Sequence, residues 1–114
     1  MTLLPIAVWE RTPYWAPELQ RELEPQGGRV TSCRTEADAA RRLTEGARQL
    51  VIALPRGEQL PLRLVMQWVA GGLRVHVVLS ETGESLRWFL SELGVTSVFT
   101  FDGARQSLVR ACVG

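Results

Sequence analysis

The sequence of 114 residues contains no lysine and no asparagine, and its only aspartates are Asp38 and Asp102. Without lysine, the chain cannot form the GxxxxGK[ST] phosphate-binding loop of nucleotide-hydrolysing enzymes. All 13 basic residues are arginines and the formal net charge is +1, so no strong field attracts nucleic acid or an anionic membrane. Because the arginines are scattered, GC-rich codon usage is a simpler explanation for them than an arginine-based phosphate site.

Thiols and imidazoles are also scarce. Cys33 and Cys112 lie far apart in the sequence, and His76 is the only histidine. This inventory supplies neither a disulfide framework nor a zinc-ligand set, and neither cysteine has a neighbour that would lower the pKa of its thiol. We expect both thiols to be reduced, buried and inert, as in a cytoplasmic protein, and His76 to be a core residue.

The chain also lacks a targeting or membrane-spanning signal. The first residues, MTLLPIAVWERT, have no basic start, and their apolar run is broken by Pro5 and ended by Glu10. A composition of 46% hydrophobic and 22% charged residues is typical of a globular domain that can bury a core of its own. No linker or low-complexity tract divides the chain, so we expect a single domain over 1–114 without a membrane partner.

Short β-rich runs alternate with helical periods along the whole chain. The predicted strands are 6–9, 29–33, 50–54, 74–79 and 97–101, and the predicted helices lie around 16–23, 36–47, 64–69, 86–93 and 104–112. Thr35, Thr82 and Asp102 precede three of these helices as candidate N-terminal caps, and glycines follow four of them as stop signals. The order of elements is therefore a repeated strand-helix unit.

Five such units predict an α/β fold, namely a three-layer, doubly wound, five-stranded parallel sheet with helices on both faces. We expect the strand order 2-1-3-4-5, with a Rossmann-like order as the alternative. In either order, the functional edge lies at the carboxyl ends of the strands. The residues that we expect to bind a ligand at this edge are Trp9, Glu10, Arg11, Arg56 and Ser80.

The stretch VHVVLSETGESLRWFLSELGVTSVFTF in the second half of the chain resembles the receiver domain of bacterial two-component response regulators. Receivers have a flavodoxin-like (βα)5 fold and end their fourth strand with Ser or Thr, which corresponds to Ser80 here. The lysine and proline that close the receiver pattern fall on Phe101 and Asp102. The resemblance implies a signalling domain of the predicted architecture.

The first half departs from the receiver pattern where the chemistry of that family takes place. Receivers hold Mg²⁺ with an acidic pair after the first strand, and Trp9 and Glu10 occupy these positions. The phosphoacceptor aspartate of the family corresponds to Leu54, followed by Pro55. Glu10 alone is a poor magnesium site, and no lysine is available to contact a transferred phosphoryl group. The resemblance therefore implies a degenerate pseudo-receiver that is not an enzyme, with no catalytic residue, metal or cofactor.

Two residues at this edge have alternative interpretations. Trp9 is expected to fill the former phosphorylation pocket, with Leu54 as its floor, although it could instead form an aromatic platform for a flat ligand. Glu10 is either a ligand contact or the partner of Arg11 or Arg56 in a salt bridge.

A second candidate site lies on the fourth predicted helix. Trp88 points away from the stripe that we expect to be buried, which consists of Leu86, Phe89, Leu90 and Leu93. An exposed tryptophan is typical of a contact surface. Arg87 is its neighbour, and Arg105 and Arg110 are expected on the same side, because receivers use the face of the fourth helix, fifth strand and fifth helix for dimerisation and partner contacts.

Three hypotheses follow. The first is a phosphorylation-independent, receiver-like protein-interaction module. The second is a small-ligand sensor that binds at the carboxyl edge of the sheet, and the third is an assembly subunit that dimerises through the surface around Trp88. A protein partner or self-association is expected, a small molecule is a further option, and nucleic acid is not expected as a partner.

Overall fold

The computed structural model describes residues 4–55, 59–80 and 84–113. Its strands are β1 (Ile6–Glu10), β2 (Val30–Cys33), β3 (Gln49–Ala53), β4 (Arg74–Leu79) and β5 (Ser97–Thr100). Its helices are α1 (Trp15–Leu23), the 3-10 turn η1 (Glu24–Gln26), α2 (Glu36–Thr44), α3 (Leu62–Ala70), α4 (Glu84–Leu93) and α5 (Phe101–Val113). Each predicted strand and helix is therefore present, with ends that differ by a few residues.

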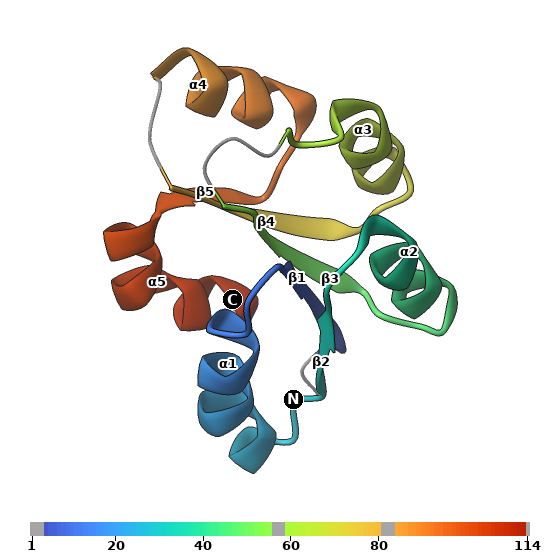
Figure 1. Ribbon diagram of the computed structural model, residues 1–114, viewed down its shortest axis with the longest axis vertical. Helices are drawn as coiled ribbons and strands as arrows, with labels where there is room; N and C mark the ends of the chain where they lie inside the picture. Colours follow the sequence, from blue (N-terminus) through green and yellow to red (C-terminus); the bar gives the residue numbers. More distant parts are fainter. Residues whose placement is uncertain (1–3, 56–58, 81–83, 114) are drawn as a thin grey trace.

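All the strand pairs are parallel, and the order across the sheet is β2-β1-β3-β4-β5. Figure 1 shows α1 and α5 together on one face of the sheet, and α2, α3 and α4 on the other. The predicted three-layer α/β fold and the strand order 2-1-3-4-5 are both confirmed. The carboxyl ends of β1, β3 and β4 meet at one edge, as expected for this topology.

The two faces of the sheet carry two separate hydrophobic cores. Ile6, Val8 and Val51 pack with the residues of α1 and α5, whereas Trp9 and Ile52 pack with those of α2, α3 and α4. Neighbouring residues of a strand belong to opposite cores because their side chains point to opposite faces. Leu50, Val51 and Ile52 follow one another on β3 and are all buried and apolar, because helices cover both of these faces.

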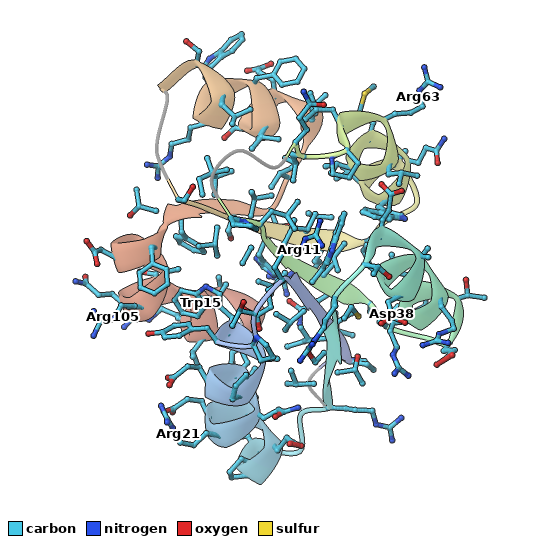
Figure 2. The ribbon with its side chains drawn as sticks, viewed as in Figure 1. Arg11, Trp15, Arg21, Asp38, Arg63 and Arg105 are labelled. Carbon is cyan, nitrogen blue, oxygen red and sulfur yellow. The ribbon has the colours of Figure 1, made fainter. Side chains whose placement is uncertain are left out.

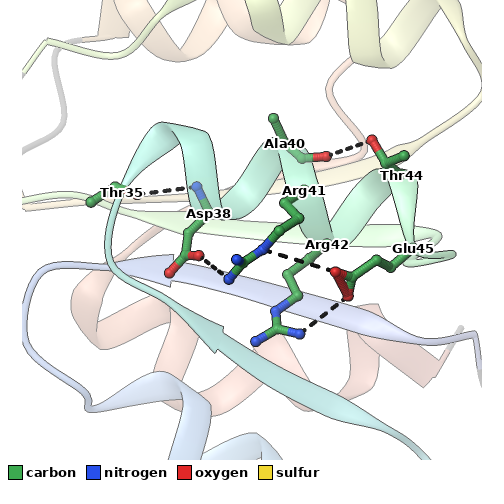
Figure 3. A network of polar contacts seen from close by, with 7 residues as sticks. All are labelled: Thr35, Asp38, Ala40, Arg41, Arg42, Thr44 and Glu45. Atoms are coloured by element: carbon green, nitrogen blue, oxygen red, sulfur yellow. Dashed lines mark hydrogen bonds and ion pairs between the residues drawn. The ribbon is translucent and has the colours of Figure 1, made fainter.

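Hydroxyl side chains cap two of the helices. Thr35 Oγ1 accepts a hydrogen bond from the backbone N–H of Asp38 at 3.1 Å, which confirms the predicted cap of α2, and Figure 3 shows this cap beside the ion pairs along the same helix. Helix α5 begins at Phe101, earlier than predicted, and Thr100 Oγ1 accepts from the N–H of Gly103 at 2.9 Å. Thr100 rather than Asp102 is thus the cap of α5. The candidate cap Thr82 lies outside the described residues.

Helix α4 is less deeply buried than its apolar stripe predicts. Leu90 is fully buried, but Leu86 is 37% exposed and Phe89 is 41% exposed. The reason is the position of α4 beside β5, an edge strand of the sheet, where a helix has fewer neighbours to cover its sides. The expectation that Leu86 and Phe89 belong to the core is wrong, and α4 exposes more apolar surface than expected.

A buried polar chain joins the amino-terminal end of the sheet to the end of α5. His76 Nε2 lies 2.9 Å from Gln49 Oε1, and Gln49 Nε2 donates to the backbone carbonyl of Cys112 at 2.9 Å. Because the amide nitrogen of Gln49 is the donor to Cys112, its oxygen is an acceptor, so His76 carries its proton on Nε2. Burial, assisted by the charge of Arg74, lowers the pKa of His76 to about 4. The histidine is therefore a neutral core residue, as predicted.

Both cysteines are free and buried, as expected. Burial raises the pKa of the Cys112 thiol to about 12, although Arg74 opposes the shift, and burial also raises the pKa of Cys33. Such thiols stay protonated and are poor nucleophiles. Within the described ranges, no helix is long and apolar enough to cross a membrane.

Candidate functional site

A cavity of about 210 Å³ opens at the carboxyl edge of the sheet, where β1, β3 and β4 end. The loop after β1, the start of α1 and the start of α5 complete its walls. Most of the lining side chains are apolar or aromatic. The lining residues are Glu10, Arg11, Thr12, Tyr14, Trp15, Ala53, Leu54, Pro55, Val78, Leu79, Ser80 and Phe101. We call this hollow the edge cavity.

Glu10 is buried beside the edge cavity, with only 3% of its surface exposed. Its Oε1 accepts a hydrogen bond from the backbone N–H of Trp15 at 3.0 Å, and its Oε2 accepts from that of Ala16 at 2.9 Å. These are the first two residues of α1, whose free N–H groups carry the positive end of the helix dipole. The carboxylate thus caps α1 from the preceding strand, which neither interpretation of the sequence anticipated.

Three aromatic rings form one wall of the edge cavity. The ring centroid of Tyr14 lies 4.9 Å from that of Trp15 and 5.0 Å from that of Phe101, and the Trp15 and Phe101 centroids lie 5.2 Å apart. Figure 2 shows Trp15 at the start of α1, facing α5. Phe101, the first residue of α5, brings this wall together with the start of α1.

The sequence analysis missed Tyr14 and Trp15. The signal was present, since the Pro13-Tyr14-Trp15 segment follows the first strand and Phe101 follows the fifth. In a parallel sheet, both segments lie at the carboxyl edge. Their contact across the fold, however, depends on how α1 and α5 pack on the same face, which the sequence pattern alone does not specify.

The structure brings three of the five candidate ligand residues together. Glu10, Arg11 and Ser80 all line the edge cavity, with Arg11 and Ser80 exposed at its rim. Arg56 lies outside the described residues. No group of three or more His, Cys, Asp or Glu side chains within the described part of the chain is arranged to hold a metal ion. The cavity is therefore a mainly apolar hollow with polar groups at its rim.

Trp9 does not fill the edge cavity. It is 6% exposed and packs on the opposite face of the sheet with Cys33, Ala39 and Ile52. It also lines a second hollow of about 340 Å³ near the start of α2, together with Arg11, Arg34, Thr35, Glu36, Leu54 and Gln59. The expected filling is wrong because Trp9 and Glu10 are neighbours on β1, so their side chains point to opposite faces.

The second candidate surface lies on α4 and α5. Trp88 is 67% exposed on α4, as predicted from its position off the buried stripe. Arg87, Arg105 and Arg110 are also exposed, and Figure 2 shows Arg105 on the outer side of α5. We refer to the three exposed apolar residues of α4, Leu86, Trp88 and Phe89, as the α4 patch.

Comparison with known proteins places this geometry among solved receiver structures. No family model and no curated protein matches the chain. A response regulator from Thermotoga maritima superposes with a TM-score of 0.79 at 15% identity, with 100% of each chain covered. A response regulator receiver domain protein from Clostridium thermocellum gives a TM-score of 0.76 at 13% identity, with 96% of this chain and 91% of that chain covered.

A third match is a response regulator from Burkholderia pseudomallei with a phosphorylated aspartic acid, a calcium ion and citrate. Its TM-score is 0.76 at 17% identity, and the match covers 96% of this chain but 66% of that longer chain. Identities this low establish shared architecture and not shared chemistry. The protein thus has the flavodoxin-like fold of response-regulator receiver domains.

Proposed function

We propose that the protein is a non-catalytic receiver-like module that signals by binding another protein and does not depend on phosphorylation. The observation that carries this proposal is the state of Glu10, whose two carboxylate oxygens are both engaged by the start of α1. Among the residues that the structure describes, it is the only acidic one that lines the edge cavity. A metal ion that bound Glu10 would have to compete with the N-terminus of that helix.

The other positions around the cavity support the same conclusion. Leu54, at the position of the phosphoacceptor aspartate in receivers, has no nucleophilic atom, and Phe101 offers no positive charge to a phosphoryl group. A phosphoryl group carries a charge near −2 at neutral pH. Among the described lining residues the one cation is Arg11, at the exposed rim, so burial of this charge against the apolar walls is unfavourable. The edge cavity is thus unsuited to the reaction on which receivers of the usual kind depend.

The α4 patch supports binding to a protein. Tryptophan and arginine are enriched among the residues that contribute most to protein interfaces, and Trp88 has Arg87 beside it. Large apolar side chains that remain exposed on one helix offer a partner apolar surface to cover. We propose either a protein partner or a second copy of the chain at this patch, in the cytoplasm, where the two free cysteines stay reduced.

The first experiment tests independence from phosphorylation. The protein is incubated with acetyl phosphate and Mg²⁺ and examined by intact-mass spectrometry, with a receiver domain that retains its aspartate as the positive control. We expect no gain of a phosphoryl group, because no carboxylate occupies the position of Leu54. Stoichiometric labelling of the unaltered protein would overturn the proposal.

The second experiment tests the α4 patch. We expect Trp88→Ala to abolish the complex or dimer, seen by sedimentation velocity or native mass spectrometry, and to leave the circular dichroism unchanged because the side chain is exposed. Met66→Ala is a matched control, since Met66 is 51% exposed on α3, a different helix. Equal complex formation by both variants and the unaltered protein would exclude the α4 patch as the interface.

A further inference from the structure

We infer that the edge cavity is a binding site for a small, uncharged, planar molecule of one or two fused rings. This goes beyond the proposed protein-binding role, because it assigns a chemical ligand to the region that in receivers carries the phosphoryl group. The inference rests on the size of the cavity, the chemistry of its described walls and the hydrogen bonds that engage the carboxylate of Glu10.

The size of the cavity suits a single or fused ring. Its volume is about 210 Å³, and an apolar cavity of roughly 150 Å³ in another protein is known to accept benzene. Trp15 and Val78 are each 5% exposed, so they form a buried floor, while Tyr14 and Phe101 are each 40% exposed and lie closer to the rim. A flat molecule can therefore enter past the rim and rest on buried apolar surface.

The aromatic wall favours a planar ligand over a branched aliphatic one. Tyr14 and Trp15 meet nearly edge to face, with an interplanar angle of 80°, and Phe101 is tilted by 47° and 57° to the two rings. Tilted rings present both faces and edges to the space between them. A further ring can therefore join the cluster by stacking or edge contacts, which are favourable at centroid distances of about 4.5–7 Å.

The electrostatics of the cavity favour a neutral ligand. Glu10 repels an anion at the floor, and the N–H groups of Trp15 and Ala16 at the positive end of the α1 dipole already offset its charge, which weakens its attraction for a cation. Arg11 carries its charge at the exposed rim, where water screens it. The hydroxyl groups of Thr12 and Ser80 also lie in the lining and can pair with one N–H or O–H group of the ligand.

Water is a poor competitor for this site. A water molecule in a protein cavity needs about two to four polar partners, whereas the floor of the edge cavity is formed largely by apolar and aromatic side chains. Release of weakly held water by an apolar ring is favourable. A ring in the cavity would contact the first residues of α1 and α5 at the same time, through Trp15 and Phe101.

Indole is a suitable probe, since it is planar, uncharged and carries one N–H donor. We would titrate the ¹⁵N-labelled protein with indole and follow the amide signals by nuclear magnetic resonance. We expect saturable shifts centred on Trp15, Ser80 and Phe101, with a dissociation constant below about 1 mM. Indole-2-carboxylate should bind at least about tenfold more weakly, because it carries a negative charge toward Glu10.

Variants of the walls test the location. Phe101→Ala removes one aromatic wall and should weaken indole binding about tenfold. Ala53→Leu should weaken it further by filling the cavity from β3, whereas Ala70→Leu is a matched control at the exposed end of α3. If Ala53→Leu fails to fold, Phe101→Ala still decides the matter, because its side chain is partly exposed.

Two results would overturn the inference. One is the absence of saturable shifts at the edge cavity. The other is equal affinity of the unaltered protein and Phe101→Ala, which would place indole elsewhere, for example on the α4 patch. Neither result bears on phosphorylation, which is measured separately by mass spectrometry with acetyl phosphate.

Discussion

Replacement of Glu10 tests whether its carboxylate serves the fold or a bound metal. If it is a helix cap, Glu10→Ala must destabilise the protein in the complete absence of Mg²⁺. The substitution leaves the N–H groups of Trp15 and Ala16 without their acceptors at a buried helix start. Glu10→Gln keeps the shape of the side chain and one good acceptor, so its effect should be smaller.

The magnitude follows from the two hydrogen bonds. A hydrogen bond to a charged group contributes about 1.5–3 kcal/mol, so the pair contributes about 3–6 kcal/mol before other terms. The Ala variant no longer buries a charge, which offsets part of this loss. We therefore expect Glu10→Ala to lower the free energy of unfolding by about 3 kcal/mol and Glu10→Gln by about 2 kcal/mol. For a chain of this size, 3 kcal/mol corresponds to a fall in Tm of about 12 °C.

Urea denaturation followed by circular dichroism, with EDTA present, measures both variants. Glu18→Ala is the matched control, because Glu18 lies on the same helix and its ion pair with Arg21 is solvent-exposed. The control should change the free energy of unfolding by less than about 0.5 kcal/mol. If Glu10→Ala is as stable as Glu18→Ala, the carboxylate does not hold the helix, and the main support for the proposed function is lost.

Three further predictions concern stability. The pKa of His76 is lowered to about 4 in the folded protein, so as the pH falls the unfolded chain binds the proton first, near pH 6.5. The contribution of the neutral histidine to stability is therefore complete above pH 6.5, and the free energy of unfolding falls by up to about 3 kcal/mol as the pH drops to 4. Urea titrations of His76→Leu should not show this loss. Gly94→Ala should lower the free energy of unfolding by about 2 kcal/mol in thermal denaturation, because Gly94 has a φ of +96° and an added Cβ would lie 2.8 Å from Val69 Cγ1. Gly46→Ala is the control and should cost about half as much, since Gly46 also has a positive φ but no atom lies within 4 Å of the added Cβ. Equal losses would exclude the contact with Val69 as a cause. Thr35→Ala should lower the denaturation midpoint by an amount equivalent to about 1 kcal/mol, and an unchanged midpoint would show that the cap contributes nothing.

The fold could be predicted from the sequence because its local signals agree with one another. The apolar runs 50–54 and 74–79 are too short for helices and are bounded by turn signals, which is typical of central parallel strands. Gly46 and Gly94 both adopt positive φ after helices, as their positions suggested. Exposure of α4 was harder to predict: the expected order 2-1-3-4-5 places the fifth strand at an edge of the sheet, but the apolar stripe of the helix does not show how little covers Phe89 there.

The candidate site was predicted only in part. The location of the site at the carboxyl edge of the sheet, and the presence of both Glu10 and Ser80 there, follow from topology alone. The position of Trp9 was predictable in principle, because alternation along β1 separates it from Glu10. The aromatic wall was not predictable from the sequence, because Trp15 and Phe101 are far apart in the chain and their contact depends on the packing of α1 against α5.

The buried chain from His76 through Gln49 to the carbonyl of Cys112 has a mechanical consequence. It fixes the last turn of α5 to the amino-terminal end of the sheet, and Arg74 adds a hydrogen bond to the carbonyl of Ala111 at 3.1 Å. A helix of this length extends about 20 Å, so Phe101 is at its far end. Any tilt of α5 must therefore pivot near Cys112 and produce its largest displacement at the aromatic ring beside the edge cavity.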